Sequence, residues 1–250
     1  MQEYDGWTGA AMTHPETDLA DIDPIQLKPI EHVQPVPVRG TGSRMDEKFA
    51  GAEAWVPSRG GLPKVEAGLA DCRGCDLWEN AEQVVPGDGP AKARMMLVGE
   101  QPGDVEDKAG RVFVGPAGRV LDKALVAAGI DRDDLYVTNA VKHFRFERRG
   151  KRRIHKTPAV GHIVACGPWL TRELEIVKPA LVVVLGAVAA RALIGTGFKV
   201  TEHRGEPVEL PDGTAAVATV HPSAVVRSDE YRRDFGLFVD DLRAAAALLS

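Results

Sequence analysis

The chain has 250 residues, of which 44% are hydrophobic and 27% are charged, as in an ordinary globular protein with one sizeable core. Its apolar runs are shorter than the roughly 18 residues that a membrane-spanning helix needs, and three cysteines are too few for a disulfide scaffold. The net charge of −5 excludes nucleic-acid binding through overall charge, so such binding would need a local basic patch. The start of the chain lacks the basic and apolar segments of a secretory signal, so we expect a cytoplasmic protein.

The first 60 residues differ in composition from the rest of the chain. Met1–Lys48 contains nine acidic residues, four basic residues and five prolines, without a helical or strand period. This composition favours extended or disordered chain, so we expect residues 1–60 to form a disordered or loosely attached tail. A short docking strand around His32–Val38 is the alternative. One folded domain is expected over residues 61–250.

From about Val65 onward, short apolar runs alternate with helical patterns. Four runs are typical of buried strands: Met95–Val98, Leu135–Asn139, Leu181–Leu185 and Ala215–Val220. The helical patterns cover Gly118–Ala128, Val160–Val177, Ala187–Ile194 and Glu230–Leu249. This alternation predicts an α/β fold, a three-layer α/β/α sandwich with a central, mainly parallel four-stranded sheet.

Ligands bind beyond the carboxyl ends of the strands in such a sheet, so the loops at that edge are candidates for a functional site. Gly99–Gly103 follows the first strand as a tight turn and presents Glu100 and Gln101 there. Asn139 ends the second strand, and its amide offers a donor and an acceptor that suit the edge of a base. His221 follows the last strand, where an imidazole could donate to an anionic leaving group. Taken singly, each of these residues is also compatible with an ordinary turn.

Three cysteines and a histidine form a candidate metal site. Cys72 and Cys75 can hold one metal ion or cluster from a single turn, with Cys166 as a third ligand and His143 as a fourth. A thioredoxin-like redox pair is the rival interpretation, but it needs a preceding strand, and the residues before Cys72 are not strand-like. Buried cysteines that act as small hydrophobic residues are the other alternative. The spacing favours a metal or an iron–sulfur cluster without choosing between zinc and iron.

The segment Lys142–Lys156 concentrates positive charge. It contains eight Lys and Arg residues and one Glu, a net charge of +7, so the rest of the chain carries −12. Two phenylalanines lie among the basic residues. A basic segment with interleaved aromatic residues suits a phosphate backbone, and its position after a strand end favours nucleic-acid binding over a merely solvated loop.

These motifs, in this order, resemble the uracil-DNA glycosylase superfamily over about Asp71–Leu242. Gly99–Gly103 is similar to the first motif of the iron–sulfur branch, family 4, and the sequence His221-Pro-Ser is similar to the second motif. Phe113, within FVGPAG, resembles the base-stacking aromatic residue, and Asn139 resembles the residue that reads the uracil edge. The resemblance further implies substrate contacts at Gly99, Ser223 and Arg227, and a [4Fe–4S] cluster on Cys72, Cys75, His143 and Cys166.

Two features depart from ordinary family 4 members. Family 4 has four cysteine ligands, whereas His143 stands at one of these positions here. The sequence Lys151-Arg-Arg-Ile-His155 resembles the KRRIH loop of the UdgX-type branch, as does Gln101 in GEQPG. That branch forms a covalent bond to DNA at the uracil site through the loop histidine, which implies that His155 is the nucleophile. The implied catalytic residues are therefore His155, Glu100, Gln101 and His221, with Lys151, Arg152 and Arg153 on the DNA.

The residues themselves support this chemistry. Uracil must be flipped out of a duplex or met in a single strand, and it departs as an anion while the deoxyribose gains oxocarbenium character. Asn139 and His221 would stabilise the departing uracil, and a neutral His155 imidazole would attack the sugar in place of water, with Glu100 holding the proton of the other ring nitrogen. The resulting adduct has a poor leaving group, so turnover should stop after one event.

We therefore expect a monomeric DNA-repair protein that excises uracil from single-stranded or duplex DNA and becomes linked to it. One alternative is a conventional multiple-turnover uracil-DNA glycosylase in which Lys151–His155 only clamps phosphate. The other is a non-catalytic, metal-containing nucleic-acid-binding module. Glu100, Asn139 and His221 on separate strand ends argue against this last alternative.

Overall fold

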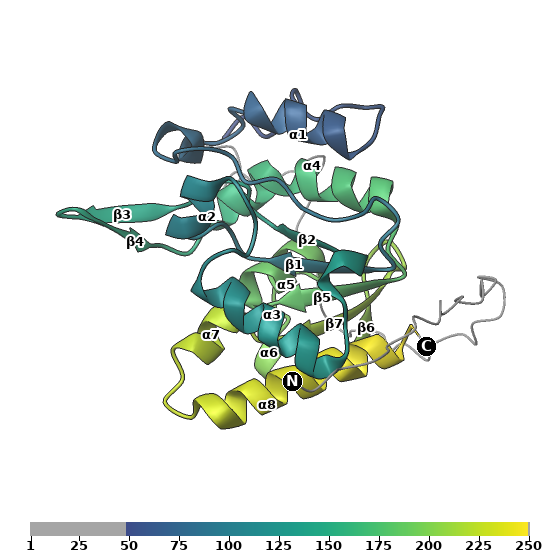
Figure 1. The fold of residues 1–250 in the computed structure, drawn as a ribbon. Helices are drawn as coiled ribbons and strands as arrows, with labels where there is room; N and C mark the ends of the chain where they lie inside the picture. The colour runs from purple at the N-terminus through teal and green to yellow at the C-terminus, as the bar shows by residue number, and fades with distance from the viewer. Residues whose placement is uncertain (1–48, 250) are drawn as a thin grey trace, which may run out of the picture.

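The computed structural model describes residues 49–249, which form three layers around one central sheet (Figure 1). The strand order is β2-β1-β5-β7-β6. Four of these strands are parallel: β1 (Met95–Gly99), β2 (Leu135–Asn139), β5 (Leu181–Leu185) and β7 (Ala215–Thr219). The predicted three-layer α/β fold with a mainly parallel sheet is confirmed. The sheet has five strands rather than four, because the short β6 (Pro207–Glu209) adds an antiparallel edge next to β7.

Residues alternate between the two faces of the sheet and so define two cores. Every residue of the four parallel strands is buried, as expected for a sheet covered on both sides. Along β1, Met95 and Leu97 face one core, whereas Met96 and Val98 face the other. Because of this alternation, the side chain of the last residue in each strand points to the face opposite to that of the residue before it.

Helices cover both faces of the sheet (Figure 1). One layer contains α3 (Pro116–Ala128), α7 (Pro222–Val226) and α8 (Tyr231–Ala247). The other layer contains α4 (Val160–Val177), α5 (Ala187–Leu193) and α6 (Val200–His203), and α1 (Leu62–Ala70) packs on the outside of α4. The remaining elements are α2 (Asp104–Ala109), two short 3-10 helices at Asp76–Glu79 and Arg132–Asp134, and a hairpin of β3 (Phe146–Arg149) and β4 (Arg152–His155).

The predicted strands and long helices are all present, with ends within two residues of those expected. The hairpin of β3 and β4 was not predicted, since we interpreted Lys142–Lys156 only as a basic segment. It pairs antiparallel and projects from one side of the molecule (Figure 1). Its turn contains Gly150 at a φ of 60°, a left-handed conformation that glycine adopts readily.

Residues 49–60 belong to the packed domain rather than to a loose tail. Phe49 is 9% exposed and Ala52 is 1% exposed, and Ala52 packs in a third core with Val65 and Trp169. Residues 1–48, including the alternative docking strand at His32–Val38, lie outside the described residues. The folded part therefore begins no later than Phe49, earlier than the boundary expected near residue 60.

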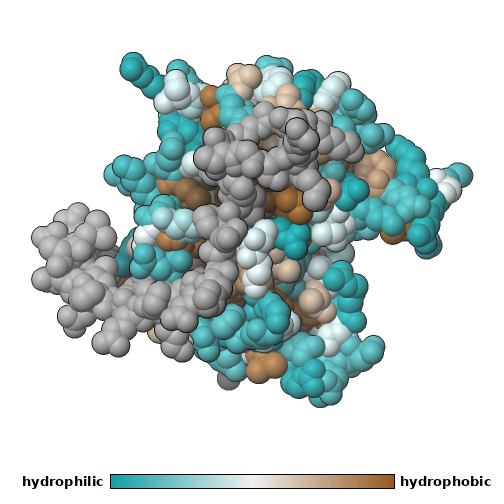
Figure 2. Space-filling model, turned by 180° about the vertical axis from the view of Figure 1, so that it is seen from behind, coloured by the Kyte–Doolittle hydropathy of each residue, from teal (hydrophilic) through white to brown (hydrophobic). Residues whose placement is uncertain are grey.

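The side opposite to the view of Figure 1 is mostly hydrophilic where it is visible, with separate small hydrophobic areas (Figure 2). Within residues 49–249, no helix is both long enough and apolar enough to cross a membrane.

Candidate active site

A cavity of about 590 Å³ opens at the carboxyl ends of the parallel strands. Glu100 enters it after β1, Asn139 at the end of β2, and His221 after β7. His155 reaches the same cavity from the end of β4. Phe113, Gln101, Ser223 and Arg227 also line it. The structure thus brings together candidate residues that lie as far apart in the sequence as Glu100 and Arg227.

Glu100 and His155 face each other inside this cavity. His155 Nε2 lies 3.4 Å from Glu100 Oε1, within ion-pair distance, but the atoms are not aligned as a hydrogen bond. Glu100 Oε1 is buried and accepts no hydrogen bond from the described residues. Burial raises the pKa of Glu100 to about 7, against the opposing charge of Arg227. Burial, assisted by Arg227, lowers the pKa of His155, so its imidazole is neutral at physiological pH.

Asn139 and Phe113 form one wall of the cavity against the backbone of Gly99. A Cβ at Gly99 would lie 2.4 Å from Asn139 Oδ1 and 2.6 Å from Phe113 Cζ, so only glycine permits this close approach. Asn139 Oδ1 is buried without a hydrogen-bond partner among the described residues. A buried amide oxygen without a partner is costly, which suggests that a ligand completes it. Phe113 has a φ of 52°, a strained conformation of the kind that gathers at binding sites.

His221 is held in one tautomer by the start of α7. Its Nδ1 accepts a hydrogen bond from the backbone N–H of Ser223 at 3.1 Å and lies 2.8 Å from Ser223 Oγ. Because Nδ1 accepts, the proton of the neutral ring is on Nε2. Burial, together with the charges of His155 and Arg227, lowers the pKa of His221 to about 4. A neutral Nε2–H donor therefore forms part of the cavity.

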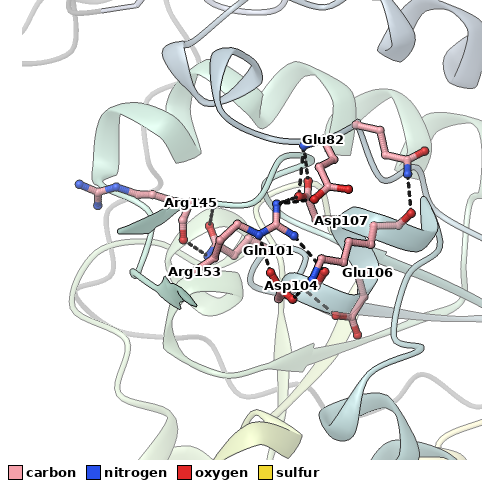
Figure 3. Close-up of polar contacts among 10 residues, drawn as sticks. Glu82, Gln101, Asp104, Glu106, Asp107, Arg145 and Arg153 are labelled. Atoms are coloured by element: carbon pink, nitrogen blue, oxygen red, sulfur yellow. Dashed lines mark hydrogen bonds and ion pairs between the residues drawn. The ribbon is translucent and has the colours of Figure 1, made fainter. Parts of the chain in front are cut away.

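The β3–β4 hairpin that carries His155 is fixed to the domain by Gln101. The Gln101 Nε2 donates to the carbonyls of Arg145 and Lys156, and its Oε1 accepts from the Arg145 backbone N–H (Figure 3). These residues lie on the two legs of the hairpin base. Gln101 is 6% exposed, and its amide is engaged with backbone rather than available to a water molecule.

Arg153 supplies the second attachment of the hairpin, and this corrects its predicted role. We expected Arg153 to contact DNA phosphates, but only 6% of its side chain is exposed. Its guanidinium is paired with Asp104, with Asp107 at 2.6 Å and with Glu82 at 3.2 Å (Figure 3). A guanidinium held by three carboxylates cannot also neutralise a phosphate. Lys151 and Arg152, at the turn of the hairpin, are exposed as expected.

Sequence reasoning missed the carboxylates that build this site. Asp104 and Asp107 hold Arg153, and Glu106 joins the two loops of the cavity by accepting from the backbone N–H groups of Gly103 and Gly115. Only the structure reveals their role, since Glu106 and Asp107 in this short acidic helix are 7% and 0% exposed. Their pattern in the sequence is indistinguishable from that of a solvated helix N-terminus.

The three cysteines and His143 lie around one small pocket next to Trp169. Burial raises the pKa of Cys166 to about 12, and the Cys75 and Cys72 thiols add to this rise. The backbone N–H of Lys142 donates to Cys166 Sγ, and the indole N–H of Trp169 donates to Cys72 Sγ, both at 3.3 Å. Burial lowers the pKa of His143 to about 4, which keeps its imidazole neutral.

The chemistry of these groups suits a soft metal centre. Thiolates with N–H donors and a neutral imidazole are ligands for iron–sulfur clusters or zinc. Within residues 49–249, no three His, Cys, Asp or Glu side chains converge closely enough to hold a single ion.

The fold and the cavity define an α/β protein whose sheet edge can enclose a flat polar ring beside an imidazole and a carboxylate. Residues 86–243 match the uracil DNA glycosylase superfamily, and the chain belongs to this family. It is 36% identical to the type-4 uracil-DNA glycosylase of Thermotoga maritima, over 71% of this chain and 89% of that protein. It is 34% identical to the type-4 uracil-DNA glycosylase of Pyrobaculum aerophilum, over 71% of this chain and 92% of that protein.

The raised pKa of Glu100 predicts a dependence of stability on pH. Between about pH 5 and pH 7 the folded protein binds a proton at Glu100 that the unfolded chain has released, so this group lowers the free energy of unfolding as pH rises. We expect Glu100→Gln to gain about 2–3 kcal/mol of stability relative to the wild type between roughly pH 5 and pH 8. Urea unfolding at both pH values measures this difference. The exposed Glu209→Gln control should show no such gain. An equal pH dependence of stability in the wild type and in Glu100→Gln would contradict the raised pKa of Glu100.

Proposed function

We propose that this protein excises uracil from DNA and remains covalently linked to the deoxyribose through His155, as in the UdgX-type branch of its family. The substrate is uracil in single-stranded or duplex DNA, and the protein acts as a monomer in cytoplasmic DNA repair. The observation that carries this proposal is the position of the neutral His155 imidazole, 3.4 Å from Glu100 in the cavity that Asn139, Phe113 and His221 line.

The cavity walls suit a flipped uracil. Phe113 offers its ring for stacking, and the partnerless Asn139 amide oxygen can accept from the uracil N3–H while the amide N–H₂ donates to a carbonyl of the base. This pairing discriminates uracil from cytosine, because cytosine carries no proton on N3. Thr157, Val105 and Val226 surround the opening, where the DNA backbone enters and leaves.

In the proposed reaction, the bond between the sugar C1′ and uracil N1 breaks, and its electron pair leaves with uracil as an anion. The Nε2–H of His221 donates to the uracil oxygen where this negative charge develops. The cationic C1′ of the sugar then receives the lone pair of the unprotonated nitrogen of His155, which forms the new C–N bond. The proton on the other ring nitrogen passes to Glu100, whose pKa of about 7 allows it to accept this proton at physiological pH.

Gln101 and Arg153 act as positioning residues in this scheme rather than on the substrate. Their hydrogen bonds and ion pairs fix the hairpin base against the first motif, so the His155 ring is placed before DNA binds. Positioning an imidazole where water attacks in an ordinary glycosylase ends the reaction in an N-linked adduct. An imidazole is a poor leaving group from a sugar carbon, so the enzyme performs a single turnover.

Cys72, Cys75, Cys166 and His143 would hold a [4Fe–4S] cluster. The cluster would supply structural cross-linking between α4, the segment around Cys72 and the segment after Asn139. It takes no part in the excision chemistry described above.

The covalent step is tested by replacing the nucleophile. His155→Ser should abolish the complex that survives denaturing electrophoresis with a uracil oligonucleotide, because serine lacks the imidazole lone pair. The cavity remains, so water can enter the vacated space and the variant should release uracil and leave an abasic site. Peptide mass spectrometry of the wild-type adduct should place the deoxyribose on His155. The half-buried His203, which lies outside the cavity, provides the control: His203→Ser should form the adduct normally. An adduct in His155→Ser, or one mapped to Lys151, would refute this mechanism.

The hairpin's two kinds of cation should respond differently to salt. Binding can be measured at several salt concentrations with an oligonucleotide whose 2′-fluoro uridine resists cleavage. Lys151→Gln should reduce the slope of log affinity against log salt by about 0.7–0.9, the contribution of one phosphate contact. Arg153→Gln should leave this slope unchanged and instead slow adduct formation, because its partners are carboxylates. A reduced slope of log affinity against log salt in Arg153→Gln would show instead that Arg153 contacts a DNA phosphate.

The cluster predicts iron in the purified protein. We expect a brown protein with broad visible absorbance and several iron atoms per chain. His143→Ala should bind iron less tightly, with His203→Ala, at a half-buried histidine outside the cysteine pocket, as the control. Zinc without iron would contradict the identity of the centre, and unchanged iron retention in His143→Ala would contradict the fourth ligand.

A further inference from the structure

A fully buried ion pair lies under the sheet edge that carries Asn139. The side chains of Lys142 and Glu173 are both 0% exposed, and Lys142 Nζ lies 2.6 Å from Glu173 Oε2. Lys142 Nζ also donates to Thr138 Oγ1 at 2.6 Å and to the Asn139 carbonyl at 2.9 Å. Glu173 additionally accepts from the Tyr136 hydroxyl. All three ammonium protons are therefore used, as a buried charge requires.

The pair lies beside a short piece of chain that connects the two candidate sites. We name residues 139–143 the linking segment. Its first residue, Asn139, lines the cavity, and its last residue, His143, lines the cysteine pocket. Between them, the backbone N–H groups of Ala140 and Val141 donate to the carbonyls of Gly99 and Glu100. The backbone N–H of Lys142 donates to Cys166 Sγ.

An apolar pair would fill this space but would not do what the ion pair does. Replacing a buried ion pair by well-packed apolar residues often leaves stability unchanged or higher, so stability alone does not explain Lys142 and Glu173. The ammonium group gives the Asn139 carbonyl a donor just where the strand ends, and Glu173 on α4 fixes the direction of that donor. Methionine and leucine cannot replace that hydrogen bond.

We infer that Lys142 and Glu173 are a positioning pair that fixes the linking segment relative to the cysteine pocket. Through this segment, the pair also fixes the positions of the Asn139 amide and the loop that carries Glu100. The inference rests on the proposed function for its effect on uracil, but its effect on the linking segment is independent of that function. A change in this pair would shift Asn139 in the cavity wall, although neither Lys142 nor Glu173 lines the cavity.

The test uses the full chain and compares the wild type with Lys142→Met/Glu173→Leu, in which no unpaired charge remains. Hydrogen exchange, read by mass spectrometry on the peptide that contains residues 139–143, should be at least about tenfold faster in this variant, while exchange in β5 and α8 is unchanged. Adduct formation with a uracil oligonucleotide, measured at a temperature at which both proteins are folded, should slow by at least about tenfold. Glu175→Gln, an exposed change two positions along the same helix, should alter neither quantity.

Glu173→Gln provides a second variant that keeps the shape of the side chain, so the inference can be tested even if the double variant does not fold. It should give faster exchange in residues 139–143 and slower adduct formation, by smaller factors. Wild-type exchange and wild-type adduct formation in either folded variant would overturn the inference. If the wild type neither binds nor processes uracil DNA, the proposed function fails, whereas the exchange measurement still decides whether the pair positions the linking segment.

Discussion

The position of His155 depends on one guanidinium. The β3–β4 hairpin projects from the domain, and an isolated two-stranded hairpin is only marginally stable in water. Arg153 joins it to α2, and the bond that matters most is with Asp107, because that carboxylate is 0% exposed and so interacts in a low dielectric. Glu82 and Asp104 are more exposed, and Lys108 already neutralises Asp104 at 2.6 Å. The basic hairpin therefore carries exposed cations near its turn and uses the buried Arg153 side chain as an anchor.

Burial sets the charges of the titratable groups in the resting cavity. Burial lowers the pKa of His155 and of His221, so both imidazoles are uncharged. Burial raises the pKa of Glu100 to about 7, so at physiological pH a large part of this carboxyl is ionised and can accept a proton. In the proposed reaction, new charges then appear as the glycosidic bond breaks, an anion on uracil and a cation on the sugar. Donors and acceptors that are already oriented stabilise these charges without rearranging, and in a buried site they do so more strongly than water would.

Much of the fold could be predicted because it rests on local apolar patterns. The runs Leu135–Asn139 and Leu181–Leu185 read directly as buried strands. The polar residues Glu100, Asn139 and His221 at strand ends marked the sheet edge. The hairpin was missed because β3 and β4 consist mainly of charged residues, and their pairing depends on contacts with Gln101 and Arg153 rather than on an apolar face. Arg153 was misassigned for a related reason. A basic residue in a basic run looks solvated, and only the three-dimensional structure shows that carboxylates from elsewhere in the chain surround it.

In the proposed mechanism, the sheet and the hairpin have separate tasks, so the same scaffold could give either turnover or capture. The sheet edge supplies everything that the departure of uracil requires, namely the wall of Phe113 and Asn139 and the donor on His221. The hairpin supplies only the group that meets the sugar cation. Water at that position would end the reaction in a free abasic site, whereas an imidazole ends it in a carbon–nitrogen bond. Since Gln101 and Arg153 join the two elements, the proposed mechanism makes the outcome of the reaction depend on the rigidity of that junction as well as on His155.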